Sequence, residues 1–347
     1  MSGISAVARR RRGCRHDPYP AAERGPGAAR LWHDGAARPR RGTIPAALLP
    51  IWLVLALAGC SVERLAVDVV GDAITGDGTA FTGDDDPELI REALPFGLKT
   101  YESMLEVSPD HSGLLLAAGR GFTVYAYLLE READTLGEAR LAQARALRSR
   151  AQKLFLRGRD YALRGLEAAH PGFRAGLSAD RVKALAAATG DDVALLYWAG
   201  AAWAGALGAR KDDLELLAEL PIAGALVGRV LALDEGFDHG AAHEFFISYE
   251  AGRPGGSMRK AREHYERARR LARGLRASIH VTLAEAVSVP EQKLEEFKAL
   301  ITKAKAQDVD AYRPLRLSNV LARERARWLE RHIPDLFLDA NLAEAPK

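Results

Sequence analysis

Apolar residues recur at helical spacing through most of this 347-residue chain, and strand-like alternation is almost absent from Pro87 onward. Tyr265, Ala268, Leu271 and Ala272, for example, lie on one face of a helix whose other side carries Arg and Glu. This spacing predicts an all-α fold. The predicted helices are 87–107, 111–133, 138–169, 178–188, 191–208, 212–233, 239–250, 257–274, 278–287, 290–307 and 314–332.

Some helices carry fragments of the tetratricopeptide pattern. Ala261, Tyr265 and Ala268 place a small residue four positions before an aromatic residue and another three positions after it. Small residues at helix crossings let neighbouring helices approach closely, and the aromatic ring fills the adjacent gap. The first-helix signature Trp-x2-Leu-Gly-x2-Tyr does not occur cleanly. We therefore expect an irregular, tetratricopeptide-like superhelix of helical hairpins.

A lipoprotein-type processing signal ends at Cys60. The apolar run 43–59 follows the basic segment 38–41 and finishes in Leu57-Ala58-Gly59-Cys60, which resembles the cleavage and lipidation site of bacterial lipoproteins. An uncleaved anchor is the alternative, but two prolines and the short length of the run favour a signal peptide. We expect lipidation of Cys60, attachment to the membrane without spanning it, and a periplasmic location. Ser61 favours the outer membrane in a Gram-negative host.

Cleavage before Cys60 changes what the charge implies. The whole chain has 49 Lys and Arg, 46 Asp and Glu, and a net charge of +3. Residues 1–59 hold ten Arg, no Lys and three acids, so residues 60–347 hold 39 basic and 43 acidic residues and carry about −4. The basic balance belongs to the leader, and nucleic acid is not an expected partner.

The chain divides into four predicted parts. They are a removed leader and signal peptide 1–59, a lipidated tether and polar loop 60–86, a single α-helical domain 87–338 and a C-terminal tail 339–347. The acidic run at 84–86 resembles a calcium loop only in composition. We interpret Asp86 as the N-cap of a helix that has Pro87 at its first position.

Longer segments, taken in order behind the lipidation signal, resemble the T component of TRAP transporters, the TatT family. The resemblance extends from about residue 60 to residue 338. The segments that carry it are Glu92-Ala-Leu-Pro-Phe-Gly-Leu-Lys99, Leu196-Tyr-Trp-Ala-Gly-Ala-Ala-Trp203, Ala218-Glu-Leu-Pro-Ile222, Gly240-Ala-Ala-His-Glu-Phe-Phe246, Gly255-Gly-Ser257 through Ala268, and Leu317-Ser-Asn-Val-Leu-Ala-Arg-Glu-Arg-Ala-Arg-Trp-Leu329.

This resemblance implies a periplasmic helical lipoprotein that docks the solute-binding P component of a tripartite transporter. It also implies a homo-oligomer and a role in binding or passing on a small hydrophobic organic acid. The family pattern contains no catalytic residues, so we expect neither an enzyme nor a cofactor. A general tetratricopeptide-like scaffold for cell-envelope assembly is the alternative that the lipidation signal and the helices support equally.

No metal or phosphate site is expected. The only cysteines are Cys14 in the leader and Cys60, so the mature body has no thiolate ligand. His239 and His243 are four residues apart and are predicted to share a helix face, but His-Glu-x-x-His is not completed after Glu244. The glycines at 252–256 lack the lysine of a phosphate loop, and we interpret them as a turn before an N-cap at Ser257.

Charged and aromatic rows leave two interpretations open. The arginines between 259 and 276 alternate with Glu263 and Glu266, which favours a solvated helix over an anion site. Aromatic residues near small ones favour helix packing, with a ligand cleft as the alternative. The ligand candidates are Tyr161, Trp198 and Trp203, with Arg157 and Arg164 as carboxylate partners.

Overall fold

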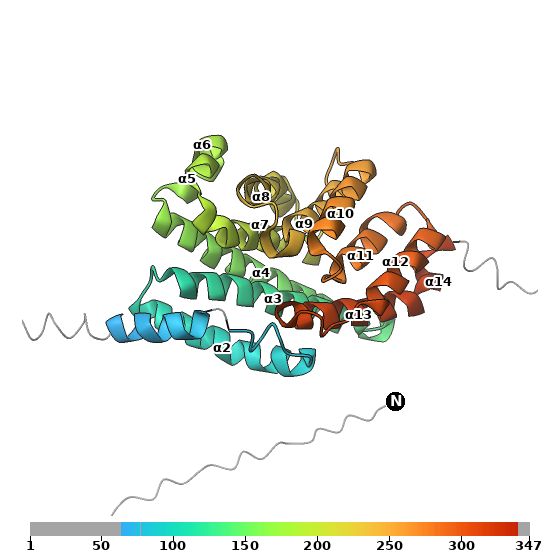
Figure 1. The fold of residues 1–347 in the computed structure, drawn as a ribbon, viewed down its shortest axis with the longest axis horizontal. Helices are drawn as coiled ribbons and strands as arrows, with labels where there is room; N and C mark the ends of the chain where they lie inside the picture. The colour runs from blue at the N-terminus through green and yellow to red at the C-terminus, as the bar shows by residue number, and fades with distance from the viewer. Residues whose placement is uncertain (1–63, 77, 339–347) are drawn as a thin grey trace, which may run out of the picture. The chain divides into compact units, whose positions relative to one another are not determined.

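The chain is helical throughout the part that the structure, a computed structural model, describes. That part is residues 64–76 and 78–338, and no strand occurs in it. Figure 1 shows the succession of helices, and the predicted all-α fold is confirmed. The tetratricopeptide-like detail stays a prediction. The predicted leader 1–59, the lipidation site Cys60 and the tail 339–347 lie outside the described residues.

Five long helices build the first half of the fold. They are α2 (Pro87–Val107), α3 (Ser112–Thr135), α4 (Leu141–Ala169), α7 (Val193–Ala209) and α8 (Leu214–Leu233). The pairs α2 with α3, α3 with α4, α4 with α7 and α7 with α8 are in contact. Asp86 accepts hydrogen bonds from the backbone N–H groups of Glu88 and Leu89, both at 3.0 Å, which confirms the predicted cap of α2.

Short helices connect α4 to α7. They are α5 (Phe173–Ala179), α6 (Arg181–Ala187) and the 3₁₀ turn η3 (Gly190–Asp192). The prediction of one helix over 178–188 is wrong, because Asp180 ends α5 and caps α6 by accepting the N–H of Lys183 at 3.1 Å. The predicted start of the preceding helix at 138 is also too early. Residues Glu138–Arg140 form a 3₁₀ turn, η2.

The second half is built from shorter helices. They are α9 (Phe237–Gly252), α10 (Met258–Ala272), α11 (Ser278–Leu283), the π-helix η4 (Ala284–Ser288), α12 (Leu294–Ala306), the 3₁₀ turn η5 (Arg313–Leu315), α13 (Arg316–Arg331) and α14 (Ile333–Leu336). Ser257 caps α10 as predicted, since its hydroxyl accepts the N–H of Lys260 at 3.3 Å. The π-helix was not predicted, because nothing in the apolar spacing distinguishes it from an α-helix.

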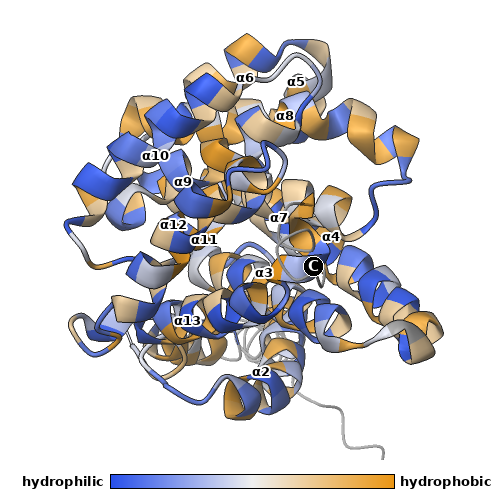
Figure 2. Cartoon of the chain, turned by 90° about the vertical axis from the view of Figure 1, so that its right-hand side faces the viewer, coloured by the Kyte–Doolittle hydropathy of each residue, from blue (hydrophilic) through white to orange (hydrophobic). Residues whose placement is uncertain are grey.

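Two clusters of buried side chains form the core. The first spans α2 to α8 and includes the fully buried Leu115 and Leu196. The second spans α9 to α14 and centres on Phe297 and Phe337, whose ring centroids are 4.9 Å apart. Figure 2 shows broad hydrophilic stretches on α10, which agrees with a solvated outer face. The two halves of the fold therefore have largely separate cores.

The start of α9 departs from helical geometry. Asp238, His239 and Gly240 all have left-handed backbone angles, with φ of 42°, 56° and 89°. The prediction that His239 and His243 share a helix face is therefore wrong, because the helical register begins only after Gly240. A left-handed backbone is costly for Asp and His, so surrounding contacts must hold this turn in place.

The predicted tether contains a helix. Residues 64–75 are helical and pack against the turn between α2 and α3, where the Ser108 hydroxyl donates a hydrogen bond of 2.6 Å to Asp68 Oδ1. In the described part of the chain, α3 and α8 are long and apolar enough to cross a membrane. Both contribute buried residues to the first core cluster, as the core helices of a folded domain do.

Candidate ligand site

Helix α4 brings three of the predicted ligand residues together. Tyr161 donates a hydrogen bond of 2.7 Å to Glu102 of α2, and Arg157 forms an ion pair with the same carboxylate. Burial opposes ionisation of Glu102, but hydrogen bonds from Lys99 and Tyr161 hold its pKa below the usual value. Arg164 lies over the Tyr161 ring and donates to the Pro109 carbonyl at 3.0 Å. Arg157, the best placed of them, is therefore already neutralised.

Trp203 serves the packing between α7, α4 and α8. Its side chain is almost fully buried, and the indole N–H donates a hydrogen bond of 2.9 Å to Glu219. The Arg159 guanidinium lies 4.7 Å from the centre of its ring. A buried indole with a satisfied N–H is a structural contact, so the geometry favours the packing alternative for Trp203.

Trp198 lies in a different environment, beside an arginine that the sequence analysis did not select. The Arg120 guanidinium of α3 is 5.7 Å from the centre of the Trp198 ring. Tyr197 lies edge-on to Trp198, with 5.3 Å between the ring centres. Arg120, Tyr197 and Trp198 thus form a group of one cation and two aromatic rings, hereafter the Arg120 cluster, at the contact of α3 with α7.

Arg120 has no charged partner at contact distance among the described residues. Among the described residues it forms no hydrogen bond and no ion pair. Burial lowers the pKa of the guanidinium, and weaker attraction to Asp238 and Tyr101 opposes that shift. The residue is nevertheless exposed to solvent. The guanidinium is thus partly desolvated by its neighbours while the side chain still reaches solvent.

Nearby carboxylates are engaged elsewhere. Arg276 is buried, and its Nη2 atom lies 2.8 Å from Asp238 Oδ2. Its Nε atom lies 3.1 Å from Glu244 Oε2, an ion pair without hydrogen-bond geometry. Burial also raises the pKa of the neighbouring Tyr197. Asp238 is thus held by Arg276 on the left-handed turn of α9, and no carboxylate in the described part of the chain forms an ion pair with Arg120.

One sequence signal could have found Arg120. It is the only charged residue in the eighteen-residue run from Ser112 to Leu129, which is otherwise apolar or weakly polar. A lone charge in such a helix is expensive to bury and is kept for a reason of pairing or binding. The Arg candidates were instead sought on the arginine-rich helix α4, where neutralising partners are plentiful.

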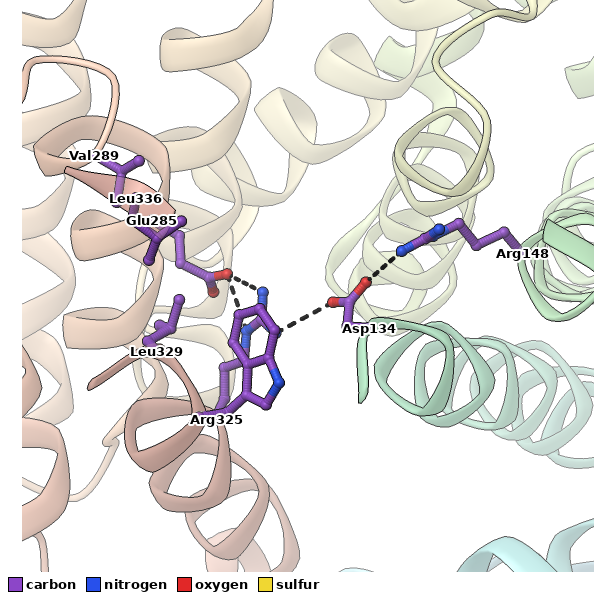
Figure 3. A pocket seen from close by; sticks show the side chains of 8 residues that line it. Asp134, Arg148, Glu285, Val289, Arg325, Leu329 and Leu336 are labelled. Atoms are coloured by element: carbon purple, nitrogen blue, oxygen red, sulfur yellow. Dashed lines mark hydrogen bonds and ion pairs between the residues drawn. The ribbon is translucent and has the colours of Figure 1, made fainter. Parts of the chain in front are cut away.

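A pocket lies where α3 and α4 meet η4 and α13. Its volume is about 240 Å³, and its apolar lining includes Val289, Leu329 and Leu336. Figure 3 shows Asp134 between Arg148 on one side and Arg325 on the other. The Asp134 oxygens lie 3.0 Å from Arg148 Nη2 and 3.2 Å from Arg325 Nη1. The π-helix carries Glu285, which accepts from Arg325 Nε at 3.0 Å.

The charged residues that line this pocket are paired with one another. Asp134 also lies 3.2 Å from Arg131, so one carboxylate serves three arginines while Glu285 serves Arg325 as well. Burial raises the pKa of the adjacent Glu130. Each guanidinium thus has a protein carboxylate, unlike Arg120. We interpret this network as the polar junction between the two halves.

Two histidines of the second half form a hydrogen-bonded chain with a glutamate. His243 Nδ1 lies 2.8 Å from His264 Nδ1, and His243 Nε2 lies 3.0 Å from Glu235 Oε1. Burial lowers the pKa of both histidines. Within residues 64–76 and 78–338, no group of three His, Cys, Asp or Glu side chains is placed to hold a metal ion.

Most of the basic row on α10 is paired. Arg259 bonds to Glu263, Arg262 to Glu291 and Glu296, Arg267 to Glu235, and Arg269 to Glu266. These pairs favour the predicted solvated helix. Arg270 and Arg273 line an open groove of about 530 Å³ beside His239. Cations at the end of a helix are also favoured by its dipole, so this groove alone does not indicate a ligand.

The fold places the protein among all-α proteins built from long helices that pack on their neighbours in the chain. Within that class, the family model of the TRAP transporter T-component matches residues 83–337, and the chain belongs to this family. A protein of Treponema pallidum (strain Nichols), described as uncharacterized, is 33% identical over 307 residues, which covers 82% of this chain and 95% of the relative. The resemblance found in the sequence is confirmed.

Proposed function

We propose that this protein is a lipid-anchored periplasmic component of a TRAP-type transport system that docks the solute-binding P component and binds a small hydrophobic organic acid. Membership of the T-component family supports a role in TRAP transport systems. Lipidation of Cys60, the periplasmic and outer-membrane location, the P-component partner, the homo-oligomer and a non-enzymatic mode of action belong to this proposal.

The Arg120 cluster is the observation that carries the ligand part of the proposal. A carboxylate would neutralise a desolvated guanidinium that has no ion-pair partner among the described residues. The rings of Trp198 and Tyr197 supply apolar surface for the rest of the ligand. Tyr161 and Arg157 offer no such unpaired group to a carboxylate, because Glu102 accepts a hydrogen bond from Tyr161 and forms an ion pair with Arg157.

The ligand proposal is tested by calorimetric titration of the full protein in detergent with monocarboxylates of increasing alkyl length. We expect Arg120→Gln to weaken binding roughly ten- to a hundredfold, since a charge-assisted hydrogen bond contributes about 1.5–3 kcal/mol. Arg259→Gln is the matched control, because Arg259 lies on the solvated face of α10. Equal affinity in the two variants would exclude Arg120 as the carboxylate partner.

Docking of the P component is tested by co-purification. The full protein, in mild detergent, is mixed with the solute-binding P component of a TRAP system from the same host, and the mass of the complex is measured. A complex at micromolar concentration supports the adaptor function. No association at tens of micromolar, together with capture of outer-membrane assembly proteins, favours the general scaffold described above.

Self-association is proposed to use the outer side of α8. Only 33% of the most apolar eighteen-residue window of this helix is buried, and Leu214 at its start is exposed. Apolar surface of this kind is typical of interfaces between subunits. A particle mass of a small multiple of the protomer, measured by light scattering with the detergent contribution subtracted, is the expected result. A monomeric mass would contradict this part of the proposal.

A further inference from the structure

Helix 64–75 has an inverted arrangement of polar and apolar side chains. At 100° per residue, positions 65, 66, 69, 70, 73 and 74 occupy one half of the helix surface, and all six are Leu, Ala, Val or Ile. Asp68, Gly71 and Thr75 lie on the opposite half. A helix on the surface of a globular protein normally turns its apolar half toward the core. Here the polar half faces the protein.

Contacts with the body fix this orientation. Asp68 accepts a hydrogen bond from Ser108, and its carbonyl lies 3.2 Å from His111 Nε2. Gly71 is buried against the same histidine, and Val67 is the apolar side chain that packs on the first core cluster. The helix is therefore attached through its polar side near the start of α3.

The other side is left in solvent. Leu65 and Val69 are 64% and 62% exposed, and Val70 and Ile74 are each 49% exposed. These four are a third of the twelve large apolar side chains that are exposed in the described part of the chain, and they lie within ten residues. A contiguous apolar patch of this kind marks a surface that an apolar partner covers.

We propose that this face lies in the interfacial region of the lipid bilayer, as a second membrane contact beside the acylated Cys60. The inference rests on the lipidation proposed above. Cys60 precedes Arg64 by four residues, which span at most about 14 Å. Acyl chains at Cys60 therefore bring the bilayer within reach of the helix. The outward half has no Lys or Arg, so binding is apolar and insensitive to salt.

The absence of thiols from the mature body after Cys60 makes a site-specific test direct. In a Cys14→Ser background, Val69→Cys and Val182→Cys each introduce one labelling site. Val182 is the matched control, because it is also a valine on a helix and is 82% exposed. It lies on α6, on the opposite side of the fold from helix 64–75 and its neighbour α2 (Figure 1). The full lipoprotein is spin-labelled and reconstituted in vesicles of phosphatidylethanolamine and phosphatidylglycerol.

The measurement is the accessibility of each label to oxygen and to a water-soluble nickel chelate. We expect a severalfold higher oxygen-to-nickel ratio at position 69 than at position 182, unchanged by added salt. Equal ratios at the two sites would overturn the proposal. Spin–spin broadening at position 69 that persists in detergent would also overturn it, because a second copy of the chain would then cover the face.

Failure of lipidation gives a different result. The background protein holds only Cys60, so any label that it takes up reports a free thiol there. Such labelling would contradict the proposed anchor, and it would be seen before vesicles are used. A blocked Cys60 with a water-exposed label at position 69 would leave the anchor intact and refute the membrane contact of the helix alone.

Discussion

At the scale of single residues, Arg120 shows that a candidate carboxylate-binding arginine is identified by whether a protein carboxylate already pairs with it. Arginines are common in this chain, yet the described structure neutralises most of them with nearby carboxylates, as at Glu102, Asp134 and Glu235. Arg120 differs because it packs against an aromatic ring and has neither a hydrogen-bond nor an ion-pair partner among the described residues. Counting arginines in a sequence does not identify such a residue, since pairing depends on helices that are distant along the chain.

Glycine at a helix crossing leads to a prediction on stability. A Cβ atom at Gly200 of α7 would lie 2.6 Å from Val227 Cγ2 and 2.9 Å from the Ala223 carbonyl oxygen of α8. We expect Gly200→Ala to lower the free energy of unfolding by about 1–3 kcal/mol, because α7 and α8 must separate. Urea unfolding followed by circular dichroism measures it. Gly190→Ala, where nothing lies within 4 Å, should show no such loss.

His280 predicts how stability depends on pH. Burial, with smaller effects of Lys303 and Arg269, lowers the pKa of His280 from 6.5 to about 4. Between these values the unfolded chain binds a proton that the folded protein does not, so stability falls as pH decreases from 6.5 toward 4. His280→Gln should flatten this part of the pH profile of urea midpoints. An unchanged slope in the variant would refute the assignment to His280.

At the scale of elements, helix type and most helix ends could be predicted, because caps are local. Asp86 and Ser257 bond to backbone N–H groups two or three residues away, and both caps were predicted. The left-handed turn 238–240 could not be predicted, because Arg276 holds Asp238 from 38 residues away. The arginine beside Trp198 is Arg120 of α3, whereas the sequence analysis placed its arginine candidates on α4.

The junction between the halves gives a prediction at this scale. Asp134 is mostly buried and contacts Arg131, Arg148 and Arg325. We expect Asp134→Asn to cost about 2–4 kcal/mol of unfolding free energy, because three guanidinium groups lose their shared carboxylate. Asp212→Asn removes a carboxylate from an exposed pair with Arg210 and should leave the denaturant midpoint unchanged. Equal midpoints for the two variants would show that the network contributes nothing.

At the scale of the whole molecule, two cores meet at a polar junction, and the proposed anchor precedes the first core. The family match covers residues 83–337 and thus both cores. The order of the helices could be predicted from spacing alone. The division into two cores could not, because it depends on which apolar faces of helices distant along the chain meet.

Membrane attachment gives a prediction for the complete protein. Cys60→Ala should release the protein from the membrane fraction or leave the uncleaved precursor, because the thiol is the proposed site of acylation. Cell fractionation and the intact mass of the product measure both outcomes. Cys14→Ala, in the predicted leader, is the matched control and should be processed normally. Normal processing and retention of the Cys60→Ala protein would refute lipidation.

The docking of helix 64–75 on Ser108 and His111 has a consequence for how far the folded body can move from the membrane. With Cys60 acylated as proposed, only three residues separate the anchored cysteine from a helix that is fixed to the body. The body then stays in a thin layer at one membrane surface and diffuses in two dimensions. It cannot itself carry a solute across the aqueous gap to the opposite membrane. Passage across that gap must fall to a freely diffusing partner, which meets this protein at the surface.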